Sequence, residues 1–358
     1  MTLPVEPPIE PMLSALQEEL PEGAEWRYEP KWDGFRCLVF REGDRLQLQS
    51  RKTQPLERYF PELLPALKAA LPERVVVDGE IVVAGPRGLD FDSLQLRIHP
   101  AASRVNKLSK EIPASFVAFD LLAEGDEDLR ARTYDERRAR LEKALKQDSQ
   151  IFITPQTTSV EEARRWFVEY EGAGMDGIIA KAGPLIYTPG ERLMVKVKHH
   201  RTVDCVVGGY RVHKKGGIGS LLLGLYDEQG VLHHVGHTTS GSSAEKKELL
   251  EKLKALEEGG DSFGKGRTPG TPSRWSSGKE LSWIQLRPEL VCEVTFDYMQ
   301  GDRFRHAAGF LRWRLDKAPR QCTFDQLSRP QSFSLEEVIK KRQAAGSSGG
   351  APVTSERS

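Results

Sequence analysis

Apolar, β-branched runs alternate with short polar turns over the first two hundred residues, as is typical of sheet strands. Glu42-Gly43-Asp44 and Gly85-Pro86 are two of these turns. We expect strands over residues 36–40, 45–49, 75–83 and 115–122, and two more over residues 177–181 and 195–198. The Pro- and Glu-rich first 25 or so residues are expected to wrap around or lead into this region.

Two helices are predicted by the spacing of their first residues. Thr133 with Glu136, and Ser159 with Glu162, have the spacing of a capping box. These pairs precede expected helices over residues 137–146 and 163–171. Residues 1–200 are therefore predicted to form one α+β domain built on antiparallel sheet.

After residue 200 the pattern changes to short strands with one helix. The expected strands cover residues 205–212, 220–226, 232–237, 290–299 and 308–314, and a charged helix begins near Ser243. This inventory is typical of an oligonucleotide-binding (OB) fold, a small closed β-barrel. We predict an all-β OB-fold domain over residues 201–327. Residues 328–358 are then a C-terminal extension, expected to be disordered over its low-complexity end.

Composition narrows the class of protein. No apolar run in the 358 residues approaches the roughly 20 needed to cross a bilayer, and the first residues lack the basic and apolar regions of a signal peptide. Four cysteines are far apart and form no CxxC pair, which argues against a zinc ribbon or a disulfide framework. We expect a cytoplasmic protein.

The formal net charge is zero, with 52 basic and 52 acidic residues, but the charges are segregated. Residues 191–215 hold seven Lys or Arg against two acids, and residues 302–320 hold six against two. Such stretches suit surfaces that face phosphates. Solvated strand edges are the alternative that charge alone leaves open.

The sequence KWDGFR at residues 31–36 carries the first candidate chemistry. A lysine followed by Asp-Gly at a turn presents its amine at a fixed point, here with Asp33 and Arg36 beside it. A lysine becomes a nucleophile when it is deprotonated, and cationic neighbours or desolvation lower its pKa toward neutrality.

Further charged segments follow in order. They are SRK at 50–52, DGE at 78–80, FVAFDLL at 116–122, DGIIAK at 176–181, KVK at 196–198 and RWRLDK at 312–317. Charged side chains in apolar strands are costly to bury unless they are paired or face a ligand. A nucleotide with its phosphates and a cation would pair all of them at once.

This ordered set resembles the covalent nucleotidyltransferases, namely ATP-dependent DNA ligases, RNA ligases and mRNA capping enzymes, over most of residues 26–327. It is most similar to the compact bacterial ATP-dependent DNA ligases of the C type. The resemblance implies sealing of 3′-OH/5′-phosphate nicks in duplex DNA, through a lysyl-AMP intermediate and in DNA repair. It also implies ATP with Mg²⁺ or Mn²⁺, nicked DNA as partner, and a monomer.

The resemblance further implies a role for each matched residue. Lys31 is implied to be the nucleophile that attacks the α-phosphate of ATP. Glu80 and Asp176 are implied to be metal ligands. The family usually has Glu at the position of Asp176. The residues implied to contact the nucleotide are Glu29, Arg36, Arg51, Glu80, Phe119, Arg192, Lys196, Lys198, Arg314, Asp316 and Lys317.

Within that set, Glu29 is expected at the adenine edge, Phe119 on its face, and Glu80 at the ribose or the metal. Lys196 and Lys198 are expected on opposite faces of their strand, so that at least one reaches the AMP phosphate.

Two alternatives remain. One is a GTP-using capping enzyme or an RNA ligase, although the sequences SRKTQPLE and LMVKVK look ligase-like. The other is a non-catalytic OB-fold nucleic-acid-binding protein. Its transferase domain would have decayed, which the intact Lys31, Glu80, Lys196 and Lys198 argue against.

Overall fold

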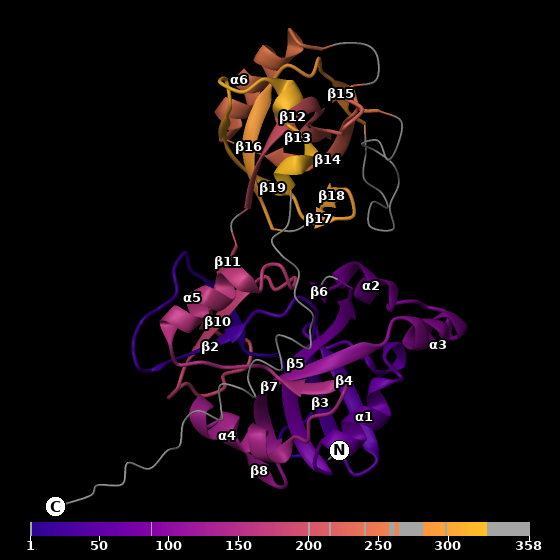
Figure 1. Cartoon of the computed structure of the whole chain (residues 1–358), viewed down its shortest axis with the longest axis vertical. Helices are drawn as coiled ribbons and strands as arrows, with labels where there is room; N and C mark the ends of the chain where they lie inside the picture. The colour runs from indigo at the N-terminus through magenta and orange to yellow at the C-terminus, as the bar shows by residue number, and fades with distance from the viewer. Residues whose placement is uncertain are drawn as a thin grey trace, which may run out of the picture. The chain divides into compact units, whose positions relative to one another are not determined.

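The computed structural model describes residues 2–86, 88–199, 201–214, 216–239, 241–257, 262–264, 282–297 and 299–327. The chain forms two compact units, with residues 1–199 in the first and residues 200–328 in the second. Figure 1 shows the elements of both units. The C-terminal extension predicted at residues 328–358 lies outside the described residues. No helix in the described ranges is long and apolar enough to span a membrane.

Two sheets form the first unit. One has the strand order β1-β11-β10-β2 and the other the order β4-β3-β5-β7-β8, with β6 on β5 and β9 on β7. The strands of the first sheet are β1 (Leu13–Leu16), β2 (Trp26–Pro30), β10 (Gly177–Ala182) and β11 (Arg192–Lys198). Those of the second sheet are β3 (Phe35–Glu42), β4 (Arg45–Ser50), β5 (Arg74–Gly85), β6 (Gly88–Leu89), β7 (Ala114–Glu124), β8 (Glu127–Asp128) and β9 (Ile151–Ile153).

The first unit contains helices α1 (Leu63–Ala70), α2 (Phe91–Leu96), α3 (Ala102–Glu111), α4 (Tyr134–Ala144) and α5 (Val160–Glu169), with a 3₁₀ turn, η1 (Glu57–Tyr59). Helices α1, α2, α4 and α5 pack on strands of these sheets. Helix α5 packs on β2 and β10 (Figure 1). The two predicted helices are confirmed, since Thr133 and Glu136 form a capping box on α4 and Ser159 accepts from the Glu162 backbone N–H.

Alternation along the first sheet separates an apolar face from a charged one. Tyr28, Ile178 and Val197 belong to the buried core that includes the α5 side chains. The intervening residues point to the opposite face. There Lys181 reaches the second sheet, donating to the Phe119 carbonyl oxygen at 3.2 Å. The charged face of one sheet is therefore turned toward the other sheet.

The N-terminal segment wraps around this unit as expected. Leu3, Val5, Ile9 and Met12 are buried. Strand β1 then pairs in parallel with β11, the strand that carries Lys196 and Lys198. The sheets are thus mainly antiparallel, with β1–β11 and β7–β9 as parallel pairs.

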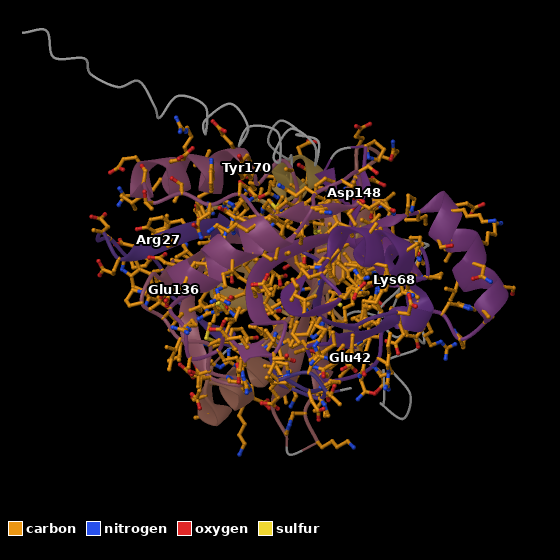
Figure 2. All side chains as sticks on the ribbon, turned by 90° about the horizontal axis from the view of Figure 1, so that it is seen from below. Arg27, Glu42, Lys68, Glu136, Asp148 and Tyr170 are labelled. Carbon is orange, nitrogen blue, oxygen red and sulfur yellow. The ribbon has the colours of Figure 1, made fainter. Side chains whose placement is uncertain are left out.

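Figure 2 shows where helix α4 joins the first sheet. Arg27 on β2 lies close to Glu136 in the first turn of α4, and its guanidinium pairs with the adjacent Asp135 at 2.8 Å. Helix α4 therefore holds a fixed position beside the charged face of the sheet.

The second unit is a closed barrel. Its main sheet has the order β13-β14-β19-β16-β12-β15, and an additional β12–β13 pairing closes five of these strands into a ring. This is the OB fold that the sequence predicted. The strands are β12 (Arg201–Val212), β13 (Ile218–Tyr226), β14 (Leu232–Thr239), β15 (Ile284–Gln285), β16 (Val291–Phe296), β17 (Met299–Gln300), β18 (Arg303–Phe304) and β19 (Ala308–Trp313). Helix α6 (Ser243–Lys254) packs on β13, and 3₁₀ turns η2 (Pro319–Gln321) and η3 (Phe324–Leu327) end the described chain.

Three cysteines that are distant in sequence meet in this barrel. Cys205 and Cys292 are directly opposite one another on β12 and β16, and both belong with Cys322 to the barrel core. All three are free thiols. Burial raises the pKa of Cys205 well above its ordinary value, so it acts as a small apolar core residue.

Gly177 allows β10 and β11 to approach closely at the start of β10. Its φ is +139°, and a Cβ there would lie 2.0 Å from the Val197 carbonyl oxygen. We expect Gly177→Ala to lower the thermal midpoint of the full chain by more than Gly43→Ala does. Gly43 has φ +59° with open space around it, so alanine there costs only the left-handed conformation, about 1–2 kcal/mol. Equal shifts in differential scanning calorimetry would contradict the close approach.

Candidate active site

Lys31 and Asp176 face one another at the end of the first sheet. Lys31 follows the last residue of β2, and Asp176 precedes the first residue of β10. The Lys31 N–H donates to the Gly177 carbonyl at 2.9 Å, and the Asp176 N–H donates to the Lys31 carbonyl at 3.0 Å. Lys198, opposite Gly177 on β11, ends at the same place. Antiparallel pairing thus brings together three residues that are distant in sequence.

The carboxylate of Asp176 is held between two lysines. The Nζ atoms of Lys31 and Lys198 lie 2.6 and 2.7 Å from Asp176 Oδ2. Burial acts to raise the pKa of Asp176, but the charges of Lys31 and Lys198 outweigh it and hold the pKa below its ordinary value. Asp176 is therefore an anion at neutral pH.

More cations act on Lys196, which lies two residues before Lys198 on β11. Burial, together with the charges of Lys198, Lys31, Arg192 and Arg51, lowers the pKa of Lys196. The positive charge of four other basic side chains thus acts on Lys196, and two of these, Lys31 and Lys198, pair with Asp176. Such an excess of positive charge favours the binding of a polyanion.

The predicted orientation of Lys196 and Lys198 is wrong. Residues two apart on a strand point to the same face, because successive side chains alternate. Their register partners Ile179 and Gly177 are likewise two apart. Both lysines therefore belong to the charged face of the sheet.

Arg36 is held by a pair of residues from two other segments. Its Nε and Nη2 atoms each lie 2.6 Å from an oxygen of the fully buried Asp78. The Tyr187 hydroxyl donates to Asp78 at 2.7 Å and accepts from the Met12 N–H at 3.0 Å. Tyr187 and Met12 were not expected at the site, because a buried tyrosine carries no sequence signal that distinguishes it from core.

Glu29 lies in a buried polar network. It is 3% exposed, and its carboxylate accepts from Lys181 at 2.8 Å, from Arg138 at 3.2 Å and from the Tyr134 hydroxyl. The side chain is therefore satisfied within the protein. The basic and hydroxyl partners come from β10 and α4, which sequence reasoning did not link to Glu29.

Phe119 is 8% exposed, and two cations lie over its ring. The Arg36 guanidinium is 4.5 Å from its ring centroid and the Lys181 Nζ is 4.7 Å away. Cations over an aromatic face stabilise the ring's position. The ring thus joins the Arg36–Asp78 pair to the Glu29 network.

Glu80 is opposite Arg36 in the β3–β5 register. Burial raises the pKa of Glu80 to about 7, against the lowering effects of Arg36 and Lys31, while Asp33 and Asp78 raise it further. Glu80 therefore changes protonation near neutral pH. Its carboxylate makes no hydrogen bond to any described residue.

The carboxylates of the site could hold a divalent cation only together with oxygen atoms of a bound ligand. No group of three His, Cys, Asp or Glu side chains is placed to hold a metal in the described part of the chain. The recorded contacts of both lysines are with Asp176 Oδ2. A divalent cation held by one or two carboxylates and phosphate oxygens is compatible with this arrangement.

The predicted residues of the second unit form their own cluster. Arg314 pairs with Asp316 at 2.8 Å and with Asp204 at 2.9 Å, and Lys317 pairs with Asp204 at 2.7 Å. Asp204 was not predicted, because it lies 110 residues from Arg314 in the sequence. These basic residues are thus fixed within the barrel by a shared acid.

Comparison with known proteins covers nearly the whole chain. Residues 10–198 match the ATP dependent DNA ligase domain, and residues 214–317 match the ATP dependent DNA ligase C terminal region. DNA ligase C of Mycobacterium tuberculosis is 51% identical over 356 residues, 95% of this chain and 99% of that protein. DNA ligase C1 of Mycolicibacterium smegmatis is 49% identical over 353 residues, 96% of this chain and 100% of that protein.

A solved structure of a Lig E DNA ligase has the same fold. It is 19% identical, covers 85% of this chain and 99% of that chain, and gives a TM-score of 0.53. At this identity the similarity concerns the fold alone.

Glu80 should make stability depend on pH. Because its folded pKa, about 7, is above the unfolded value near 4.5, the folded state binds more protons between these pH values. The stability contributed by this group is therefore present at low pH and falls as pH rises toward 7. We expect Glu80→Gln to raise the thermal midpoint relative to the unmodified chain more at pH 8 than at pH 5. A constant difference across that range would contradict the raised pKa.

Proposed function

This chain belongs to the ATP-dependent DNA ligases and is a phosphodiester bond-forming enzyme; from that premise we propose how its own residues carry out the reaction. Lys31 attacks the α-phosphate of ATP, a P–N bond forms, and pyrophosphate leaves. AMP then passes to the 5′-phosphate at a nick, and the 3′-OH displaces AMP. Each step is a nucleotidyl transfer, in which positioning and charge neutralisation supply most of the catalysis.

The observation that carries this proposal is the pair of lysines on Asp176, together with the further cations that act on Lys196. Lys31 must face a nucleotide phosphate, and Lys196, Lys198, Arg51 and Arg192 supply charge for the phosphates beside it. Asp176 orients Lys31 and Lys198 through one oxygen. Nucleophilic attack requires Lys31 to leave this contact and lose its proton.

The remaining residues bind the other parts of the nucleotide. Phe119 contacts the adenine face, Glu29 its edge, and Arg36 the sugar or phosphate. A family member requires ATP and a divalent cation, which neutralises phosphate charge when bound. Glu80 and Asp176 would hold that cation, Mg²⁺ or Mn²⁺, together with phosphate oxygens.

We assign formation of lysyl-AMP to the residues around Lys31 in residues 1–200. To the barrel at residues 201–327 we assign DNA contact through phosphates and, during the first step, contact with the β- and γ-phosphates of ATP. The protein then acts as a monomer on nicked duplex DNA at the nucleoid, in the cytoplasm, with a role in repair. The family membership does not favour a GTP-using capping enzyme or a non-catalytic OB-fold protein.

Covalent labelling tests the nucleophile. We expect incubation with α-labelled ATP, but not GTP, to label the protein, and Lys31→Ala to abolish the label. Lys31→Arg should abolish it as well, because a guanidinium stays protonated and cannot attack phosphorus. Thermal midpoints near that of the unmodified chain provide the folding control. Label retained by either variant would exclude Lys31.

A second test separates the steps of the reaction. Arg314, Asp316 and Lys317 are assigned to the β- and γ-phosphates, which are present only in the first step. Arg314→Ala should therefore lose lysyl-AMP formation by at least tenfold yet seal a nick that is already adenylated. Lys196→Ala, which acts on the AMP phosphate, should be impaired with both substrates. Equal loss of both activities in Arg314→Ala would contradict a role confined to the leaving group.

A further inference from the structure

A single buried carboxylate joins the two basic residues assigned to the leaving phosphates. Arg314 Nη1 lies 2.9 Å from each oxygen of Asp204, and Lys317 Nζ lies 2.7 Å from Oδ2 of the same group. Asp204 is 8% exposed. Because both cations bind one carboxylate, their charged ends are fixed at a short separation from one another.

The backbone of Asp204 is itself fixed on both sides by Gln326. The Gln326 amide oxygen accepts from the Asp204 N–H at 3.2 Å, and its Nε2 donates to the Asp204 carbonyl at 3.1 Å. Gln326 Oε1 also accepts from Lys317 Nζ at 3.3 Å. The barrel core holds the strand, since the neighbours Val203 and Cys205 are buried in it.

The two carboxylate partners of Arg314 differ in burial. Its Nε and Nη2 atoms bind Asp316, whose side chain is 68% exposed, at 2.9 and 2.8 Å. Its Nη1 atom binds Asp204, which is buried and has a fixed backbone. Exposed ion pairs contribute little, whereas a buried carboxylate that loses a partner is strongly penalised. Asp204 is therefore the contact that sets the direction of the guanidinium.

We propose that Asp204, supported by Gln326, is a positioning residue that aims Arg314 and Lys317 at the pyrophosphate leaving group. This inference rests on the role proposed above for Arg314 and Lys317. Two cations held by one carboxylate present adjacent positive ends, as two linked phosphates require. Prior ordering of the pair lowers the entropic cost of orienting it when ATP binds.

The main test is the effect of Asp204→Asn on separate steps. The variant keeps the side-chain shape, but its NH₂ group cannot accept from Arg314 or Lys317. We expect the KM for ATP in lysyl-AMP formation to rise about tenfold or more, the size expected for a lost charge-assisted contact. Sealing of a pre-adenylated nick should stay within about twofold. Gln326→Ala should change KM in the same direction by less.

The reverse reaction supplies a readout that a purely structural role would not change. Pyrophosphate attacks the lysyl-AMP phosphorus, the P–N bond breaks, ATP forms and Lys31 regains its proton. The same contacts bind pyrophosphate. Asp204→Asn should therefore raise the pyrophosphate concentration that gives half-maximal ATP formation by about the same factor as the KM for ATP.

The matched control is Glu293→Gln. Glu293 is opposite Asp204 in the β12–β16 register and pairs with Arg312 at 2.7 Å. Glu293→Gln therefore removes one negative charge beside the cluster, as Asp204→Asn does within it. The KM of Glu293→Gln for ATP should remain within about twofold of the unmodified value. An unchanged KM in Asp204→Asn, or equal loss of both steps with a lowered thermal midpoint, would overturn the inference. Absence of lysyl-AMP in the unmodified chain would instead contradict the proposed function.

Discussion

The contact of two lysines with one oxygen of Asp176 is the constraint on which the site depends. Lys31 and Lys198 lie at the ends of strands that meet only because β2, β10 and β11 pair in one register. Like charges so close would repel one another, and the carboxylate between them offsets that repulsion. The same acid leaves the surrounding cations in excess, so the site remains suited to a polyanion.

A second layer of buried ion pairs holds the rest of the site. Asp78 fixes Arg36, and Glu29 fixes Lys181, while the Phe119 ring lies against both cations. Buried charges are tolerated only when they are paired and hydrogen-bonded, which explains why Tyr187 and Tyr134 complete these networks. These contacts link the charged faces of the two sheets.

The barrel uses the same arrangement independently. Asp204 holds Arg314 and Lys317 as Asp176 holds Lys31 and Lys198, with one acid between two cations. Cations assigned to phosphate contacts are thus ordered before the ligand binds in both units. The difference lies in burial, since Asp204 is 8% exposed and its backbone is fixed by Gln326.

Local pattern was sufficient to determine the elements and the class of chemistry. Apolar, β-branched runs bounded by turn residues located β3, β5, β7 and five barrel strands. The Thr133–Glu136 pair marked the start of α4. These signals depend on residues only a few positions apart. The ordered motifs around Lys31 indicated a nucleotidyltransferase. The parallel β1 strand, by contrast, was not predicted, since its short run has no periodic signal and is fixed by β11.

Tertiary structure alone decided which groups hold the candidate residues. Asp204 reaches Arg314, and Tyr187 reaches Asp78, across about a hundred residues, and a buried tyrosine or a single strand acid gives no sign of its distant partner. The cysteines of the barrel converge for the same reason. Strand register brings these groups together, and register is set by the packing of whole apolar faces, which no local stretch of sequence contains.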